Sequence, residues 1–292
     1  MKKKVSFIVT AVFGVMILIF VVAGLCVHAA EKNSFPPGNI YFARHNSFLS
    51  WTDDLYNPYF VLQLYEVKGG DRFIDYKDIM MRDSDGKQYE LKDAGIQTIF
   101  SDIYFTSYRI TCVLDRKDLK IEKTVFEHAV LVAQDGTESV FPIGYVSIYL
   151  GDSAEEQELQ FSSGTGSAVA LNSYNVQITN ISSHTVQITG MEWNLERITI
   201  SELGYYDHDN RYFQIGDGVE LHSGDSIILH CKMEGDEEYR GKPFTELMPL
   251  LKYVSEGKVY EAATTTRATY FAQMTRGEIK DYLWRSYEGS SI

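Results

Sequence analysis

The residues from Ser226 to Phe271, SIILHCKMEGDEEYRGKPFTELMPLLKYVSEGKVYEAATTTRATYF, decide the fold that we expect, because an earlier stretch repeats their pattern. The earlier stretch runs from Tyr108 to Tyr149 and reads YRITCVLDRKDLKIEKTVFEHAVLVAQDGTESVFPIGYVSIY. Each begins with alternating apolar and polar residues, and a cysteine stands on the apolar side. Alternation with a period of two is typical of a strand with one face on a core and the other in water.

The two stretches continue in the same way, with a charged connection, a phenylalanine, an apolar strand, an acidic-Gly turn and a last strand. Cys112 and Cys231 are 119 residues apart, and the turn glycines Gly136 and Gly257 are 121 residues apart. Similar offsets relate upstream segments, namely Asn57–Leu62 to Asn172–Gln177 and Tyr41–Phe42 to Gln160–Phe161. We therefore predict an all-β chain of two tandem β-sandwich domains that arose by internal duplication.

The expected organisation follows from these repeats and from the composition between them. A slip in the alternation at Gly190 predicts a β-bulge, since glycine within a strand often marks one. The expected segments are a signal anchor or signal peptide at 1–30, a linker at 31–38, β-sandwich domains at 39–150 and 155–275, and an amphipathic helix at 276–288.

The second copy carries a family resemblance. Its residues VQITNISSHTVQITGMEW, from Val176 to Trp193, are followed by LHSGDSIIL, from Leu221 to Leu229. This pair of segments resembles the Ig-like β-sandwich modules of Gram-positive bacterial surface and exported proteins, although His222 and Ser223 precede Gly224 where many modules have Pro-Gly. The resemblance covers about Tyr174 to Met233 and extends to the first domain only through the repeat. It implies two Ig-like domains at a cell surface.

The amino terminus predicts export. Three lysines, Lys2 to Lys4, precede an apolar run of 23 residues from Val5 to Val27. A run of about 20 residues is long enough to span a bilayer, which favours an uncleaved anchor. Val27-His28-Ala29 also fits a signal-peptidase site, which would release a secreted protein near Ala30. Both alternatives place the chain from Glu31 onward outside the cytoplasm.

Charge excludes one class of partner. Beyond the three lysines the chain has 24 basic and 40 acidic residues, a formal charge of −16. Nucleic acids and anionic lipid surfaces require a basic face. We expect neither as a partner, and we expect the charge to maintain solubility at a surface.

Two cysteines fall in the predicted strands, at Cys112 and Cys231. A disulfide needs Cα atoms within about 7 Å. Because the two cysteines occupy equivalent inward positions of separate domains, we predict free, buried thiols that act as small apolar side chains.

The end of the chain has a helix signature. Thr275 and Glu278 have the spacing of a capping box, and apolar residues follow at helical intervals. We predict a helix from Arg276 to Glu288 that docks on the second domain, with display to a partner as the alternative.

Catalytic and metal-binding motifs are missing from the sequence. It contains no G-x-S-x-G, H-E-x-x-H, C-x-x-C, P-loop or dinucleotide fingerprint. The acidic runs Asp83–Gly86 and Asp207–Asp209 are predicted to be hairpin turns and hydrated loops. We therefore predict no enzymatic activity, no catalytic residue, no cofactor and no metal.

Aromatic residues are the only candidate ligand contacts. They crowd two stretches, and Phe213 extends the second; the candidates are Trp51, Tyr56, Tyr59, Tyr205, Tyr206 and Tyr212. Exposed rings stack on sugars or grip peptides, but rings in a β-sandwich also fill cores and edges.

These observations favour a non-enzymatic, membrane-tethered ectodomain that acts in binding, adhesion or scaffolding, with a surface protein or a glycan as partner. Three alternatives stay open: a carbohydrate-binding module, an accessory subunit of an envelope complex, and a secreted hydrolase. The hydrolase would need paired carboxylates or a Ser/His pair in a concave site.

Overall fold

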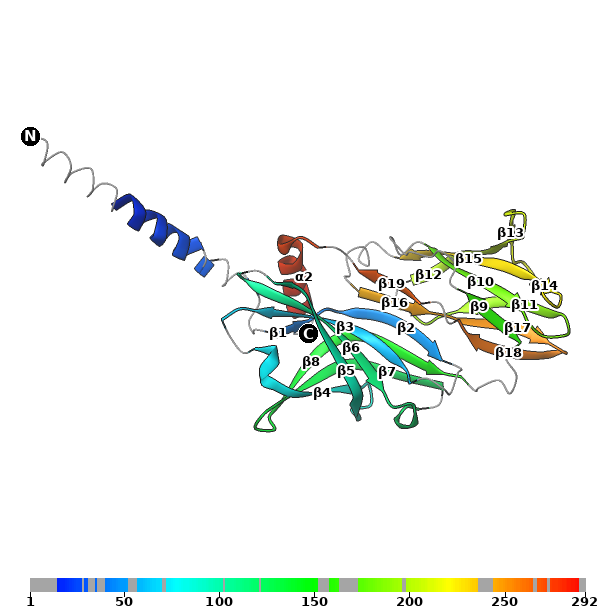
Figure 1. Ribbon diagram of the computed structural model, residues 1–292, viewed down its shortest axis with the longest axis horizontal. Helices are drawn as coiled ribbons and strands as arrows, with labels where there is room; N and C mark the ends of the chain where they lie inside the picture. Colours follow the sequence, from blue (N-terminus) through cyan, green and yellow to red (C-terminus); the bar gives the residue numbers. More distant parts are fainter. Residues whose placement is uncertain are drawn as a thin grey trace, which may run out of the picture.

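The computed structural model is built mainly from β-strands, as the alternation predicts. Two lobes lie side by side, with strands β16 and β19 between them (Figure 1). The structure describes residues 15–27, 29–30, 35, 40–51, 57–69, 72–101, 103–120, 122–151, 158–162, 173–195, 198–235, 244–264, 267–271 and 274–288.

The first lobe contains one long, folded sheet. Its strands are β1 (Ile40–Phe42), β2 (His45–Trp51), β3 (Tyr59–Val67), β4 (Tyr76–Asp83), β5 (Gln88–Ser101), β6 (Phe105–Leu114), β7 (Glu122–Ala133) and β8 (Glu138–Leu150). The strand order is β1-β3-β6-β5-β4-β7-β8-β2-β16-β19. β1 pairs antiparallel with β3, whereas β2, which follows it in the chain, pairs parallel with β8. The two layers enclose a core that includes Phe60, Cys112 and Phe126.

The second lobe is a sandwich of two separate sheets. Its strands are β9 (Leu159–Ser162), β10 (Ser173–Asn180), β11 (Val186–Glu192), β12 (Ile198–Tyr206), β13 (Tyr212–Gln214), β14 (Val219–Leu221), β15 (Ser226–Gly235), β17 (Leu250–Ser255) and β18 (Lys258–Ala263). One sheet has the order β13-β12-β15-β10-β9 and the other β14-β11-β17-β18. Alternating side chains of both sheets, among them Val176, Ile188 and Cys231, fill the core between them.

One hairpin belongs to both lobes. β16 (Phe244–Met248) pairs parallel with β2 of the first lobe and antiparallel with β19 (Ala268–Phe271). Only Pro249 separates β16 from β17, which pairs in the second lobe. Both β16 and β19 fall within the range expected for the second domain, 155–275, yet they extend the sheet of the first lobe (Figure 1).

The local turn chemistry follows the sequence. The predicted bulge is confirmed, because the register of β11 on β17 shifts between Ile188 and Gly190. The acidic-Gly turns join β7 to β8 and β17 to β18, and Gly136 and Gly257 have φ angles of 86° and 78°. Glycine takes this left-handed region without the steric penalty that other residues meet.

Helix α2 (Arg276–Glu288) has the predicted bounds and the predicted cap. The backbone N–H of Thr275 donates to Glu278 Oε2 at 2.7 Å, and the Glu278 N–H donates to Thr275 Oγ1 at 3.4 Å. We expected the helix to dock on the second domain, but it docks on the first lobe. Ile279 and Leu283 pack in a third cluster with Phe35 and with residues of the first lobe, among them Ala43, Tyr65, Val67 and Phe105. The prediction was wrong because helical periodicity shows which face is apolar, but not which surface that face meets.

Residues 15–27 form a helix that projects from the first lobe (Figure 1). Large apolar side chains are exposed all along it; Phe20 is 75% exposed and Leu25 is 63% exposed. Within the described residues, no helix has the length and apolar character needed to cross a membrane.

Candidate functional site

Four aromatic side chains gather on the hairpin of β12 and β13. The strands pair Tyr205 with Phe213 and Tyr206 with Tyr212. Neighbouring residues of a strand point to opposite faces. The hairpin therefore carries one aromatic pair on each face, with ring centroids 5.4 Å and 5.3 Å apart. Tyr205 packs at the edge of the second core, while Phe213 is 43% exposed.

The face that carries Tyr206 and Tyr212 also includes His230 of β15. The His230 ring lies 5.8 Å from Tyr206 and 6.0 Å from Tyr212, and both contacts are edge-on. His230 Nδ1 is 2.6 Å from Asn175 Oδ1, which fixes the imidazole on the sheet. Rings, an imidazole and an amide thus share the outer face of the five-stranded sheet.

Gly204 allows Tyr212 to lie close against this sheet. A Cβ at position 204 would come within 2.5 Å of Tyr212 Cζ, so a larger residue would displace the ring. The position of the ring affects its titration, because burial, and then the neighbouring Glu202 carboxylate, raises the pKa of Tyr212 to about 12. The hydroxyl is therefore a neutral hydrogen-bonding group beside a carboxylate across the physiological range. We name Asn175, Gly204, Tyr206, Tyr212 and His230 the aromatic face.

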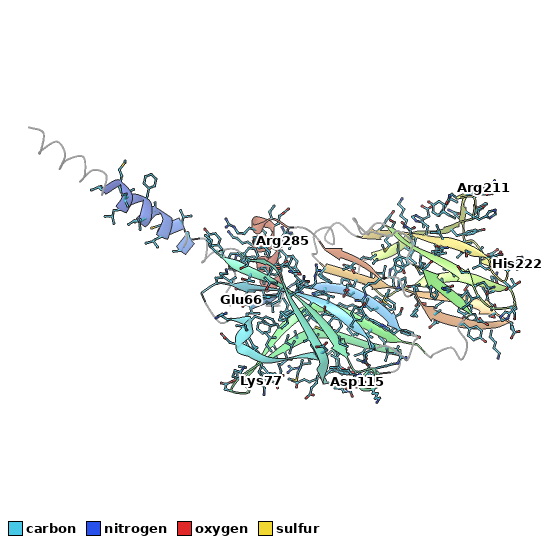
Figure 2. All side chains as sticks on the ribbon, in the orientation of Figure 1. Glu66, Lys77, Asp115, Arg211, His222 and Arg285 are labelled. Atoms are coloured by element: carbon cyan, nitrogen blue, oxygen red, sulfur yellow. The ribbon has the colours of Figure 1, made fainter. Side chains whose placement is uncertain are left out.

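The hairpin lies at the end of the molecule remote from the N-terminal helix. Arg211, in the turn between β12 and β13, is seen at this end in Figure 2. The turn is a closed local structure, since Asp207 Oδ1 accepts hydrogen bonds from the N–H groups of Asp209 and Arg211 at 2.9 Å each. Asp209 also pairs with Arg211 at 3.1 Å. Asp207 and Asp209 thus have partners within the turn, and no group of His, Cys, Asp and Glu residues in the described parts of the chain is arranged to hold a metal.

The other predicted aromatics lie at the junction of the two lobes. Trp51 is 7% exposed and its ring is 6.2 Å from that of Tyr59. The Arg267 guanidinium lies over Tyr59 at 3.9 Å and over Trp51 at 5.7 Å. These two rings therefore line the junction and are separate from the aromatic face, whereas Tyr56 lies outside the described residues.

Arg267 is held by a buried carboxylate that the sequence did not point out. Glu246 of β16 is 1% exposed; its Oε1 is 3.1 Å from Arg267 Nη1, and its Oε2 accepts from the Val61 N–H at 2.9 Å. Burial raises the pKa of Glu246, while Arg267 and the Val61 N–H oppose the rise. The sequence does not show that Glu246 is buried, because its partners are distant in sequence: Val61 lies in β3, and Arg267 comes just before β19.

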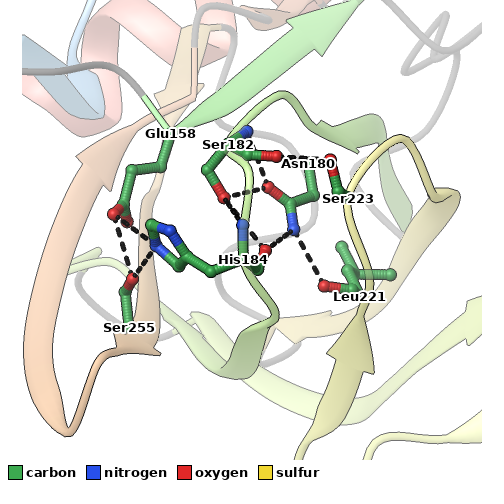
Figure 3. A network of polar contacts seen from close by, with 7 residues as sticks. All are labelled: Glu158, Asn180, Ser182, His184, Leu221, Ser223 and Ser255. Carbon is green, nitrogen blue, oxygen red and sulfur yellow. Dashed lines mark hydrogen bonds and ion pairs between the residues drawn. The ribbon is translucent and has the colours of Figure 1, made fainter.

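A Ser–His–Glu cluster closes one end of the second lobe (Figure 3). His184 Nε2 is 2.7 Å from Ser255 Oγ and 3.0 Å from Glu158 Oε1, and Ser255 Oγ donates to the same Glu158 oxygen at 2.9 Å. Next to it, Asn180 Nδ2 donates to the backbone oxygens of His184 and Leu221. These bonds join the residue before β9, the turn between β10 and β11, β14 and β17.

The cluster lacks the geometry of a nucleophilic triad. In a triad, the serine and the carboxylate contact different imidazole nitrogens, so that one nitrogen takes the proton while the other is oriented. Here Ser255 and Glu158 both contact Nε2 of His184. Ser255 is also 1% exposed, which keeps its hydroxyl away from a substrate. We conclude that this cluster joins strands.

The two cysteines of the lobes are free and buried, as predicted. Both are 0% exposed, on the central strands β6 and β15. Burial raises the pKa of the Cys231 thiol to about 12, and burial followed by Glu246 raises that of Cys112 further. Neither thiol is a nucleophile at neutral pH, since reactivity needs the thiolate.

No family model and no curated protein matches the chain. Among solved structures, a protein of unknown function from Porphyromonas gingivalis W83 is similar at 11% sequence identity, over 79% of this chain and 99% of that one, with a TM-score of 0.23. Similarity at this level supports no argument about fold or function.

Proposed function

We propose that the chain is a membrane-tethered, extracytoplasmic tandem of two Ig-like β-sandwich modules that binds a partner at the cell surface and has no enzymatic activity. The strand order supports the tandem most directly. The order β1-β3-β6-β5 in the first lobe has the counterpart β9-β10-β15-β12 in the second, with the cysteine strands β6 and β15 in corresponding places. The turns at Gly136 and Gly257 also follow corresponding strands, β7 and β17.

The pairing of β1 and β2 supports the Ig-like assignment. One continuous segment pairs antiparallel with β3 in one layer and then parallel with β8 in the other. In this arrangement the first part of the segment belongs to one layer of the sandwich and the second part to the other layer. The local resemblance at Val176–Trp193 favours the same class for the second lobe.

The N-terminal helix supports the tether. Residues 15–27 expose apolar side chains on all sides, which in water would be costly. In the sequence, Lys2–Lys4 precede the apolar run Val5–Val27 and supply the positive flank that stays in the cytoplasm. In this arrangement the two lobes lie on the outer side of the membrane, with the aromatic face far from it.

The aromatic face is the feature that favours binding. Its rings and polar groups come from four strands of one sheet, β10, β12, β13 and β15, which suits recognition of a peptide or a glycan. A glycan is the second candidate, because a sugar offers apolar C–H faces to the rings and hydroxyls to Asn175 and Glu202.

Binding of purified full-length protein to intact cells and to a glycan array tests this proposal. The double change Tyr206→Ala and Tyr212→Ala should reduce binding at least tenfold, and Tyr260→Ala should leave it unchanged, because Tyr260 stacks on Tyr253 in the other sheet. Equal binding by both variants would contradict a role for the aromatic face. Recovery from cells of a mature amino terminus at Ala30 or Glu31 would contradict the tether alone.

A further inference from the structure

The long strand β5 has an open edge. Gln88–Glu90 pair with β4, whereas from Leu91 to Ser101 the strand pairs with β6 on one side. Among the residues that the structure describes, no strand pairs with the other side of this segment. Every second residue of this segment therefore directs its backbone N–H and C=O away from β6, where they can pair with another strand.

Beyond Asp93, this edge lacks the charges and prolines that usually protect an edge strand against pairing. Edge strands of monomers are usually short, or carry charges or proline. Ala94 to Ser101, AGIQTIFS, has no charged residue and no proline in a chain of which 23% is charged. Ile96, Ile99 and Phe100 are 55%, 44% and 50% exposed. The register on β6 is regular from Asp93 to Thr98, between two bulges, so the segment is straight enough to template a strand.

We propose that β5 pairs antiparallel with β5 of a second copy of this chain, about a two-fold axis at Gln97. Unpaired backbone groups of a strand are matched only by the backbone of another extended strand, which favours a peptide partner over a lipid or a sugar. A two-fold axis makes the same edge serve both partners, as in most homodimers.

The sequence of β5 is complementary to itself in this register. About Gln97, residues whose numbers add to 194 face each other, so that Ile96 of each copy lies opposite the β-branched Thr98 of the other. Beyond the bulge, the large apolar Ile99 and Phe100 of one copy lie near the small Ala94 and Gly95 of the other. Such cross-strand pairs are the unit that stabilises a sheet.

Charge is complementary at the two ends. Asp93 of one copy faces Ser101 of the other, and Lys68 Nζ lies 3.0 Å from Ser101 Oγ. Both Asp93 and Lys68 are exposed in the single chain. An ion pair between Asp93 of one copy and Lys68 of the other would form twice, once at each end of the interface. The bulge near Ile99 shifts the register by one residue, about 3.3 Å, which the long lysine side chain spans.

A cysteine at the two-fold axis tests the register. Facing residues of antiparallel strands have Cα atoms about 4.5–5.5 Å apart, which suits a disulfide. Full-length Gln97→Cys, in detergent and with the exposed Cys26 changed to Ser, should form a covalent dimer on mild oxidation. Val259→Cys is the matched control, since Val259 is 71% exposed on the edge strand β18, and it should stay monomeric.

A charge in the edge tests the interface without a cross-link. Ile96→Lys should shift the sedimentation of the full-length protein from dimer to monomer, and Val259→Lys should leave the dimer intact. A monomeric unmodified protein, or equal cross-linking of Gln97→Cys and Val259→Cys, would overturn the proposal. Protection of the β5 amides from hydrogen exchange only when lipid vesicles are added would also overturn it, and would assign this edge to a membrane surface.

Discussion

Asp83 shows how a single buried carboxylate organises a turn. Its side chain accepts from the N–H groups of Asp85 and Lys87 at 3.0 Å and 2.8 Å and from the Tyr89 hydroxyl at 3.0 Å. The Lys120 ammonium lies 3.7 Å away. Burial alone would raise the pKa of Asp83, but these donors and Lys120 outweigh it and lower the pKa below 3.8. The ionised form is therefore the one that the fold stabilises.

We expect Asp83→Asn to lower the free energy of unfolding by about 1–3 kcal/mol at pH 7. Because the pKa is lower in the folded state, the stabilisation by Asp83 is present above pH 3.8 and is lost as the pH falls through the folded pKa. The difference between the two proteins should thus shrink below pH 3.8. Urea unfolding across this pH range measures it.

Asp207→Asn is the matched control for this change. Asp207 makes the same two bonds to backbone N–H groups, but its turn lies at the remote, more exposed end of the molecule. Asp207→Asn should therefore lower the free energy of unfolding by less than Asp83→Asn does. A loss from Asp83→Asn that stays constant from pH 7 to pH 2 would contradict the assigned ionisation.

At the scale of elements, α2 fastens the chain to the first lobe. Leu283 is 2% exposed in the cluster with Phe35 and Phe105, and the Tyr282 hydroxyl accepts a hydrogen bond from the Arg44 N–H. The helix is only 13 residues long, and a helix of this length is marginal without tertiary contacts. Its stability therefore depends on docking.

We expect Leu283→Ala to cost about 2–5 kcal/mol of docking free energy, as for other buried leucines. Because the helix packs on one surface, the loss should appear first as faster hydrogen exchange of α2, with little change in the second lobe. Asp281→Ala, at an exposed position of the same helix, should change exchange little. Equal acceleration in both lobes would show that α2 is not a local unit.

At the scale of the whole molecule, one long hairpin joins the two lobes. Its first arm is β16 followed by β17, and its second arm is β18 followed by β19. Ser50 of β2 supports the crossing point, because its hydroxyl lies 2.7 Å from Met248 O and 3.1 Å from Pro249 O, and the side chain is fully buried. Thr264 Oγ1 donates to Pro249 O at 3.0 Å and accepts from the Tyr174 hydroxyl at 2.8 Å. Residues of both lobes thus hold the crossing point of this hairpin.

We expect the two lobes to unfold in one cooperative thermal transition. Ser50→Ala removes the buried hydroxyl that donates to Met248 O, while Pro249 O keeps Thr264 as a donor, and the change should cost about 1–3 kcal/mol. This change should lower the stability of both lobes together, whereas Ser201→Ala, at an exposed serine, should have little effect. Calorimetry that resolved two transitions in the unmodified protein would contradict a shared hairpin of this strength.

The sequence predicts the local features of this fold better than its long-range contacts. Alternation around Cys112 and Cys231 predicts two buried thiols on strands, and Thr275 with Glu278 predicts the start of α2, because each signal depends on neighbouring residues. The sequence does not show that β16 joins β2, since the pairing of Phe244 with His45 depends on surfaces that exist only after folding. The same reason explains why Glu246 was not recognised, and why the candidate aromatics divide between the β12–β13 hairpin and the junction.

The pairing of β16 with β2 also has a consequence for biogenesis. In the export that we propose, a chain that crosses the membrane from its amino end delivers β1 to β8 well before β16, so the edge of β2 stays unpaired until about 200 further residues have crossed. Contacts between such distant segments form slowly, and an uncovered edge is prone to pair wrongly in the meantime. α2, which arrives last, must then return to the first lobe. On this proposal we expect the early part of the chain to depend most on chaperones during export, and its folding to be complete only after β16 and α2 have emerged.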